Sequence, residues 1–281
     1  MAIRRYFEFV RFSHTVFALP FALASMVVVA RDSRGWPGWR TFLLILAAMV
    51  CARTAAMGFN RIVDRRYDAL NPRTAGRHLT TGQMSVTGAW WLVIGAAAGL
   101  IVTAWFINAI CFWLAPVALV VIGFYSFTKR FTSFSHFFLG LSLALAPLGA
   151  WLAVTGTFAW PPVALAVAVV LWLVGFDIIY ATQDVEFDRR AGLHSLPARL
   201  GIPAALRVAQ AAHAGMAATL LAFVLISGMR WPYYAGLAVI ALCLVWQHFL
   251  ARRQDPVSLN VAFFRLNAII SVVFLLAVVL G

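Results

Sequence analysis

Two clusters of carboxylates occur in a chain that has only nine acidic residues. The first reads Asn60-Arg-Ile-Val-Asp64-Arg-Arg-Tyr-Asp68, and the second reads Asp184-Val-Glu-Phe-Asp188. On a helix, this four-residue spacing puts an amide and two carboxylates on one face in the first cluster, within roughly 12 Å along the axis. It puts two carboxylates on one face in the second. Like charges at this spacing repel each other, so we expect each cluster to need a compensating cation.

The chemistry of these side chains favours a hard divalent cation. No His or Cys lies within either cluster, and oxygen ligands alone suit Mg²⁺ or Mn²⁺ rather than zinc. Proteins usually hold Mg²⁺ through one or two carboxylates together with phosphate oxygens of a substrate. The clusters therefore predict metal ions that bridge carboxylates to a diphosphate. The alternative is that they are solvated acids that balance neighbouring arginines, and the repeated spacing favours the metal site.

Basic side chains after the first cluster are placed to meet the charge of a diphosphate. Asn71-Pro72 and Gly76 mark a turn. We expect this turn to let Arg73 and Arg77 reach back over the helix end, and Arg binds phosphate through two parallel hydrogen bonds.

Further polar residues lie at the end of, or inside, apolar stretches. Tyr125, Lys129 and Arg130 close the fourth apolar stretch, so a ring would face the site one turn before an ammonium group. The alternatives are an aromatic residue and a cationic pair that anchor the helix end at the membrane surface. Arg53 and Asp177 lie inside apolar stretches, where a charge must face a polar cavity or a partner. We expect both to line a substrate cavity, the alternative being a structural ion pair.

The elements that position these residues are membrane helices. The 281 residues are 63% hydrophobic and 11% charged, and the mean hydropathy is +0.90, far from that of water-soluble domains. A spanning helix needs about 20 mostly apolar residues. Nine stretches qualify: 12–30, 41–59, 87–107, 109–125, 135–155, 160–182, 207–228, 232–250 and 262–280. With no linker long enough to divide the chain, we expect one all-α membrane domain over residues 1–281. The first stretch has no signal-peptide cleavage pattern, so we expect it to remain as a helix.

The positive charges predict the orientation of this bundle. With the N-terminus in the cytoplasm, 17 of the 22 Lys and Arg residues fall on the cytoplasmic side, as expected for a protein of an inner membrane. The two loops richest in ionisable residues follow the second and sixth stretches, so function is expected on the cytoplasmic face.

The net charge of +13 is spread over short loops, which favours anionic lipid and an anionic substrate over nucleic acid as binding partners. Single cysteines in apolar stretches are interpreted as packing residues.

Taken together, these motifs resemble the UbiA superfamily of intramembrane prenyltransferases, and the resemblance covers almost the whole chain. The stretch from Arg53 to Asp68, with Arg73 and Arg77 after it, resembles the family's first motif. The stretch from Gly175 to Asp188 resembles its second motif, and 125–130 resembles the end of its fourth helix.

The resemblance implies a bundle of about nine transmembrane helices around a central cavity, and a prenyl transfer onto an aromatic ring that releases diphosphate. By this analogy Mg²⁺ is bound by the following residues: Asn60, Asp64, Asp68, Asp184 and Asp188. Candidate contacts of the diphosphate are the following: Arg73, Arg77, Lys129 and Arg130. Tyr125 would orient or shield the allylic cation, and Arg53 would pair with a carboxylate of the acceptor, with Asp177 also in the substrate cavity.

The acceptor is expected to be a small aromatic acid, in ubiquinone or menaquinone biosynthesis. The run Tyr180-Ala-Thr-Gln-Asp184 looks closest to the 4-hydroxybenzoate branch of the family. The stretches 12–23 and 263–267 resemble instead a subgroup associated with menaquinone made through futalosine, whose acceptor is 1,4-dihydroxy-6-naphthoate. The opening also has His14 near the place where we would expect a lysine in proteobacterial 4-hydroxybenzoate enzymes, so both acceptors stay open.

Two other functions use similar residues. A cation-coupled transporter binds its ion through carboxylates deep in broken spans, whereas these acids are expected at helix ends beside basic loops. A CDP-alcohol phosphotransferase also pairs carboxylates four residues apart, but its Asp-Gly-x-x-Ala-Arg opening is absent from this sequence. Metal-dependent release of diphosphate separates the three functions.

Overall fold

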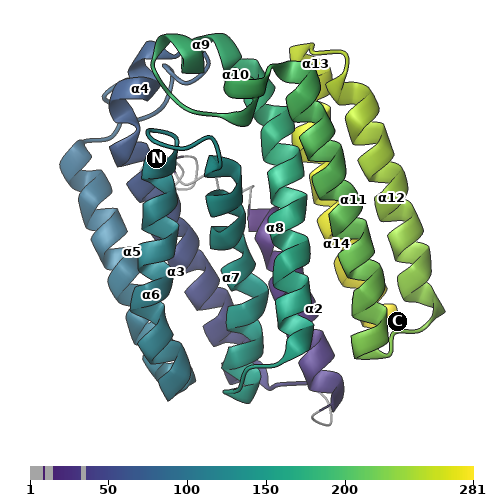
Figure 1. The fold of residues 1–281 in the computed structure, drawn as a ribbon. Coiled ribbons are helices and arrows are strands. Elements are labelled where there is room, and N and C mark those ends of the chain that lie inside the picture. The colour runs from purple at the N-terminus through teal and green to yellow at the C-terminus, as the bar shows by residue number, and fades with distance from the viewer. Residues whose placement is uncertain (1–8, 10–14, 33–35) are drawn as a thin grey trace. The chain divides into compact units, whose positions relative to one another are not determined.

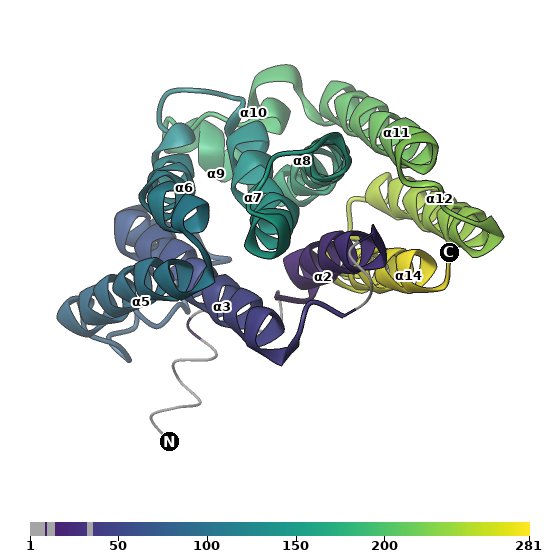
Figure 2. The same ribbon diagram turned by 90° about the horizontal axis from the view of Figure 1, so that it is seen from below.

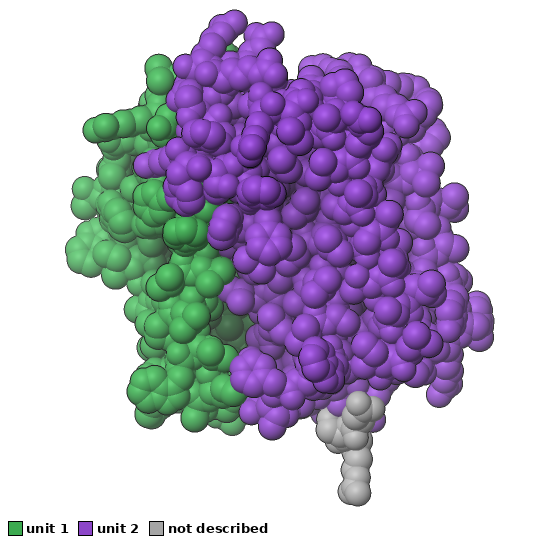
Figure 3. Space-filling model, viewed as in Figure 1, with its two compact units in different colours: residues 1–15, 38–128 green, residues 16–37, 129–281 purple. Residues whose placement is uncertain are grey.

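The computed structural model describes residues 9, 15–32 and 36–281, and every regular element in them is helical (Figure 1). His14 and the first part of the stretch 12–23 lie outside the described residues. The chain divides into two compact units, which Figure 3 shows in different colours. Unit 1 holds residues 1–15 and 38–128, and unit 2 holds residues 16–37 and 129–281. Each unit carries one of the two acidic motifs.

The described part of unit 1 has three long helices and one short one: α3 (Trp39–Val63), α4 (Arg65–Leu70), α5 (Val86–Ile107) and α6 (Ala109–Thr128). Helix α3 packs along α5, and two glycines allow the close approach. A methyl group added to Gly58 would lie 2.7 Å from Val93, and one added to Gly99 would lie 2.9 Å from Cys51. Small residues at such contacts are typical of membrane helices, because dispersion forces and close backbone packing drive their association.

Unit 2 is built around α8, which lies between α7 and α11 in Figure 2. Its long helices are α2 (Thr15–Asp32), α7 (Ser135–Thr155), α8 (Trp160–Ala181), α11 (Ile202–Ser227), α12 (Trp231–Ala251) and α14 (Asn267–Leu280). Its short elements are η2 (Thr182–Asp184), α9 (Val185–Arg190), α10 (Leu196–Leu200), α13 (Pro256–Asn260) and the π-helical η3 (Val261–Leu266). Phe21, Trp172 and Phe274 are all fully buried at its centre, and Phe21 stacks on Phe274 with 4.6 Å between the ring centroids.

Buried polar side chains join the helices of unit 2. The Trp172 indole N–H donates to Asn267 Oδ1 over 2.9 Å, and the Ser25 hydroxyl donates to the carbonyl of Pro147 over 2.7 Å. His213 on α11 and His248 on α12 share a hydrogen bond of 2.9 Å. Since lipid offers no hydrogen-bond partners, such bonds hold polar groups that would otherwise be unsatisfied inside the bundle.

The prediction of an all-α polytopic membrane bundle is confirmed. Within the described part of the chain, eight helical segments are long and apolar enough to cross a membrane, and residues 17–31 of α2 form a shorter apolar stretch. Several predicted boundaries were wrong by a few residues. Helix α11 begins at Ile202, before the predicted stretch 207–228, and Arg207 is an exposed residue within it. The last predicted span, 262–280, begins inside the π-helical η3 and is preceded by α13, because the Asp255 side chain accepts from Ser258 N–H and starts a helix there.

Candidate active site

The first acidic motif lies where α3 ends, and its backbone differs from the prediction. A single continuous helical face over residues 60–68 was expected, but α3 ends at Val63 and α4 begins at Arg65, with Asp64 at the junction (φ −87°, ψ 1°). The N–H of Asp64 still donates to the Asn60 carbonyl, and that of Asp68 to the Asp64 carbonyl. The bend therefore keeps the four-residue spacing while it redirects the second turn. Asn60 Nδ2 donates to Asp64 Oδ2 over 2.8 Å.

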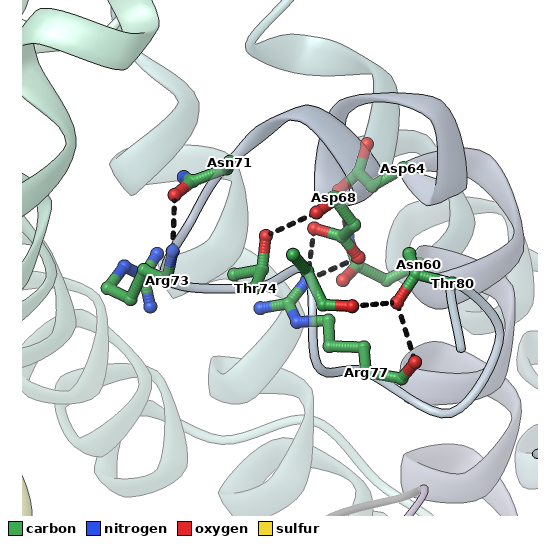
Figure 4. Close-up of polar contacts among 9 residues, drawn as sticks. Asn60, Asp64, Asp68, Asn71, Arg73, Thr74, Arg77 and Thr80 are labelled. Carbon is green, nitrogen blue, oxygen red and sulfur yellow. Dashed lines mark hydrogen bonds and ion pairs between the residues drawn. The ribbon is translucent and has the colours of Figure 1, made fainter.

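Asp68 is held by the loop that follows it (Figure 4). Arg77 Nη1 lies 2.5 Å from Asp68 Oδ1 and 2.6 Å from Oδ2, and the Thr74 hydroxyl donates to the Asp68 carbonyl. Asn71 Oδ1 accepts from the N–H of Arg73, which tightens the predicted turn. Arg77 thus reaches back over the helix end as predicted, and its partner in this structure is the carboxylate of Asp68. Arg73 is exposed.

Tyr125, near the end of α6, belongs to the same group of charges. It interacts electrostatically with Asp64, Arg61 and Arg53, so the structure brings together three of the residues expected to act on a substrate. Arg61, one of the 17 positive charges expected on the cytoplasmic side, lies in the last turn of α3 and is only 6% exposed. Its spacing of eight residues after Arg53 and three before Asp64 puts it on their helical face, a signal that the sequence analysis missed.

The second acidic motif has the same local design as the first. Helix α8 ends at Ala181, one 3₁₀ turn covers Thr182–Asp184, and α9 continues from Val185. The expected continuous helical face is therefore again broken beside its first acid. Asp184 and Asp188 are both buried, with 6% and 1% of their surface exposed. In Figure 1 this region forms the end of unit 2 at which α9 and α10 lie.

Lys129 is a cation that faces this second motif. Its Nζ lies 3.5 Å from Asp188 Oδ2, and its carbonyl accepts from the N–H of His194 over 2.7 Å, so the segment before α7 is tied to the loop after α9. The sequence placed Lys129 beside Tyr125 on one helix, whereas α6 ends at Thr128 and Lys129 belongs to unit 2. Arg130 is exposed. Glu186, within the same motif, is 85% exposed and pairs with Arg190.

Asp177 has a buried partner that the sequence analysis missed. His136, in the first turn of α7, lies with Nδ1 2.6 Å from Asp177 Oδ2, and its side chain is 1% exposed against 21% for Asp177. A histidine and an aspartate 41 residues apart share no local pattern, so only the packing of α7 against α8 reveals the pair.

The acids fit a magnesium ion that is completed by a substrate. Among the described residues, no three His, Cys, Asp or Glu side chains gather into a metal site, so neither motif holds a full set of protein ligands. Asp188 Oδ2 is buried and accepts no hydrogen bond from the described residues; Lys129 Nζ lies 3.5 Å away from it, so this anionic oxygen has room for a metal ion as a closer partner. Mg²⁺ is commonly held by one or two carboxylates, with waters and phosphate oxygens as the remaining ligands.

Comparison with known proteins identifies relatives over most of the chain. The model of the UbiA prenyltransferase family matches residues 18–269. A 4-hydroxybenzoate octaprenyltransferase of Alcanivorax borkumensis is 33% identical over 258 residues, which cover 89% of this chain and 86% of that protein.

Solved structures show the same fold. The apo structure of a UbiA homolog from Aeropyrum pernix K1 has a TM-score of 0.85 and 30% identity, over 95% of this chain and 97% of that one. A UbiA homolog from Archaeoglobus fulgidus bound to GPP and Mg²⁺ has a TM-score of 0.74 and 21% identity, over 99% of this chain and 100% of that one. At 21% identity, the similarity to the Archaeoglobus structure shows the fold alone.

Proposed function

Because the chain belongs to the UbiA prenyltransferase family, we propose that it transfers a polyprenyl group from a prenyl diphosphate to an aromatic hydroxy acid and releases diphosphate. The observation that carries this proposal is that the two acidic motifs have the same local structure. Each motif lies at the end of a membrane helix and contains two aspartates. In each motif a basic side chain lies beside a buried aspartate: Arg77 lies beside Asp68, and Lys129 lies beside Asp188.

The acids of both motifs are proposed to hold Mg²⁺ with the diphosphate of the donor. Asn60, Asp64 and Asp68 serve from unit 1, and Asp184 and Asp188 serve from unit 2. When bound, the metal supplies positive charge that offsets the charge developing on the leaving diphosphate. The Archaeoglobus homolog of this fold was obtained with GPP and Mg²⁺, in agreement with this choice of donor and metal.

Four basic side chains are proposed to bind the same diphosphate: Arg73, Arg77, Lys129 and Arg130. Arg77 and Lys129 already lie beside motif carboxylates, and Arg73 and Arg130 are exposed. In the reaction the bond between C1 of the prenyl chain and the diphosphate oxygen breaks, and the electron pair leaves with the diphosphate. Cationic groups that are already in place stabilise this charge without reorganisation.

The acceptor is proposed to meet Arg53 and Tyr125. Arg53 lies inside the membrane helix α3, where its guanidinium would pair with the carboxylate of an aromatic acid through two hydrogen bonds. The ring of Tyr125 would shield the allylic cation with its π face. The ring carbon of the acceptor next to the hydroxyl then attacks C1. The apolar helices keep out water, which would otherwise capture the cation.

The acceptor is proposed to be of the 4-hydroxybenzoate or the 1,4-dihydroxy-6-naphthoate type, for ubiquinone or menaquinone. The relative from Alcanivorax bears a 4-hydroxybenzoate name, which favours the first. In the structure, Tyr180 of the second motif stacks on Phe263 with 4.0 Å between the ring centroids. Phe263 is the first residue of the stretch 263–267, which resembles the futalosine subgroup, and Tyr180 begins the run that resembles the 4-hydroxybenzoate branch. A residue from each of these two stretches therefore lies in contact with the other.

The protein is a multi-pass membrane protein, and we propose the cytoplasmic membrane of a bacterium with the N-terminus and both motifs on the cytoplasmic side. The distribution of Lys and Arg supports this orientation. The motif acids lie where α3 and α8 end, and this position disfavours the transporter alternative, which needs acids deep inside broken spans.

The test is an assay of the detergent-purified protein with geranyl diphosphate and Mg²⁺, in which 4-hydroxybenzoate and 1,4-dihydroxy-6-naphthoate are offered separately. Mass spectrometry detects prenylated product, and released diphosphate is measured in parallel. Product from one acceptor establishes the reaction and selects the pathway. A folded protein that binds neither acceptor and releases no diphosphate, even with longer donors, would contradict the proposal.

A further inference from the structure

Asp177 and His136 form a hydrogen-bonded pair inside unit 2 to which the reaction described above gives no chemical task. The pair joins the first turn of α7 to α8 through His136 Nδ1 and Asp177 Oδ2, 2.6 Å apart. A carboxylate inside a membrane helix is costly to bury, and it persists where it has a partner and a function.

The two side chains differ in their access to a substrate. The side chain of His136 is 1% exposed and that of Asp177 is 21% exposed, so only the aspartate can touch a bound molecule. The contact with His136 is made by Oδ2 of Asp177, so it does not occupy the second oxygen, Oδ1. The imidazole therefore fixes one oxygen of the carboxylate and leaves the other for a donor from outside.

The place of Asp177 along α8 suits a group that acts on the acceptor. It precedes Asp184 by seven residues, which corresponds to two turns or about 10 Å along a helix axis. The diphosphate proposed at Asp184 is joined to C1 of the prenyl chain, and the acceptor ring must lie next to C1. A carboxylate two turns deeper in the membrane than the metal ligands is therefore placed for the acceptor rather than for the diphosphate.

We propose that Asp177 is the general base of the transfer and that His136 is a positioning residue that holds it. This inference rests on the proposed function. Asp177 takes the proton of the acceptor hydroxyl as the ring carbon beside it forms a bond to C1 and the bond from C1 to diphosphate breaks. The resulting dienone then loses the proton from the alkylated ring carbon while Asp177 returns its proton to the oxygen. Prenylated phenol, diphosphate and one proton are the products.

Two other titratable groups of unit 2, on or beside helices that pack against α8, have partners of their own. In unit 2, Lys129 is paired with Asp188 before α7 begins. On α11, His213 is bonded to the Trp172 carbonyl and to His248. The pH dependence of the base is therefore expected to come from the Asp177–His136 pair itself.

The experiment measures kcat and KM for the aromatic acceptor across pH with the full-length protein in detergent, Mg²⁺ and geranyl diphosphate. For Asp177→Asn we expect kcat to fall by about 10²- to 10⁴-fold at neutral pH, the usual contribution of a general base. The loss should shrink as pH rises, because the acceptor hydroxyl then ionises without help. A uniform loss at every pH, or an unchanged profile, would overturn the assignment.

Two substitutions of His136 separate positioning from packing. Asparagine keeps an N–H near the place of Nδ1, so His136→Asn should retain most of kcat, whereas His136→Leu should lower kcat and move the acidic limb of the pH profile. His213→Asn removes another buried imidazole of unit 2 and serves as the control, with an unmoved profile. Equal effects of His136→Asn and His136→Leu on kcat and on the profile would contradict a positioning role.

A measurement on the unmodified protein keeps the inference testable if the Asp177 variant does not fold. Fluorine beside the acceptor hydroxyl makes that hydroxyl more acidic. If an enzyme carboxylate is the base, the acidic limb of the pH profile stays in place with the fluorinated acceptor. A limb that shifts with the acidity of the acceptor means that the hydroxyl ionises in solution, and the base assignment fails while the prenyl transfer stands. Absence of any prenylated product from the unmodified protein, by contrast, overturns the proposed function itself.

Discussion

Asp68 and Asp188 are equivalent members of their motifs, yet different cations face them. Arg77 Nη1 lies within hydrogen-bond distance of both oxygens of Asp68, while the ammonium of Lys129 lies 3.5 Å from one oxygen of Asp188. A guanidinium is a rigid planar donor and an ammonium is a compact charge on a flexible stem. The two motifs therefore have similar acids but different electrostatic partners, and substitutions at each should have different effects.

The motif acids themselves should be indispensable. Replacing Asp64 or Asp184 by Asn removes a charge that Mg²⁺ requires, and several kcal/mol of lost charge stabilisation lowers the rate by two or three orders of magnitude. Release of diphosphate and formation of product measure the loss. Glu186→Gln is the matched control, since this exposed acid pairs with Arg190, and its activity should stay near that of the unmodified protein. Full activity of Asp64→Asn would exclude the assigned role.

Arg77→Lys should weaken binding of the donor although the charge is kept. The substitution loses contacts to Asp68 that a guanidinium makes, and hydrogen bonds to charged groups contribute about 1.5–3 kcal/mol each. We expect KM for geranyl diphosphate to rise by about 10- to 100-fold, with a smaller change in kcat. Steady-state kinetics at saturating Mg²⁺ measure the split. An unchanged KM would show that Arg77 has no part in binding the donor.

At the scale of elements, the spans of unit 2 are held together by small residues and close contacts between backbones. A methyl group added to Gly236 on α12 would lie 2.4 Å from the Cβ of Ala277 on α14, so no side chain fits there without separating the helices. A methyl group added to Gly175 of α8 would likewise clash with the ring of His213. Packing of the helix that carries the second motif thus depends on residues that have no chemistry of their own.

Gly236→Ala is therefore expected to destabilise the protein by about 1–3 kcal/mol, the usual cost of overpacking a core. Thermal unfolding in detergent measures it as a lower Tm. Gly149→Ala on α7 is the control, because an added methyl group meets nothing within 4 Å there. Since Ala is the better helix former, that control should keep or raise the Tm. Equal Tm values for the two variants would contradict the packing argument.

At the scale of the whole molecule, the two acidic motifs lie in different compact units, and the proposed function requires both to serve the same diphosphate. Residues that act as one group in a reaction have effects that do not add. Kinetic measurements on variants can therefore test whether the two motifs serve the same diphosphate.

The double variant Asp64→Asn with Asp184→Asn should lose little more activity than the more damaging of its two single variants. Rates of product formation at saturating substrates give the three values to compare. Losses that multiply would mean that the motifs act independently, against a shared donor. The Asp64→Asn variant combined with Glu186→Gln gives the reference, because Glu186 lies outside the proposed site and should add nothing.

The sequence alone was enough to predict the membrane character, most of the spans and both motifs. Hydropathy over about 20 residues and a four-residue spacing are local properties, and the bilayer imposes helices on apolar stretches of that length. The interruptions of the helices at Asp64 and at Thr182–Asp184 were not predicted, because neither place carries the Pro or Gly that usually marks a helix end.

Only the tertiary structure decided which groups face the acids. Lys129 meets Asp188, and His136 meets Asp177, across long separations in the chain, and Arg61 is buried in the last turn of α3. Such partners are selected by how helices pack and by the cost of leaving a charge unpaired away from water. A membrane span is encoded within itself, whereas the environment of a charge inside the bundle is set by residues from other helices.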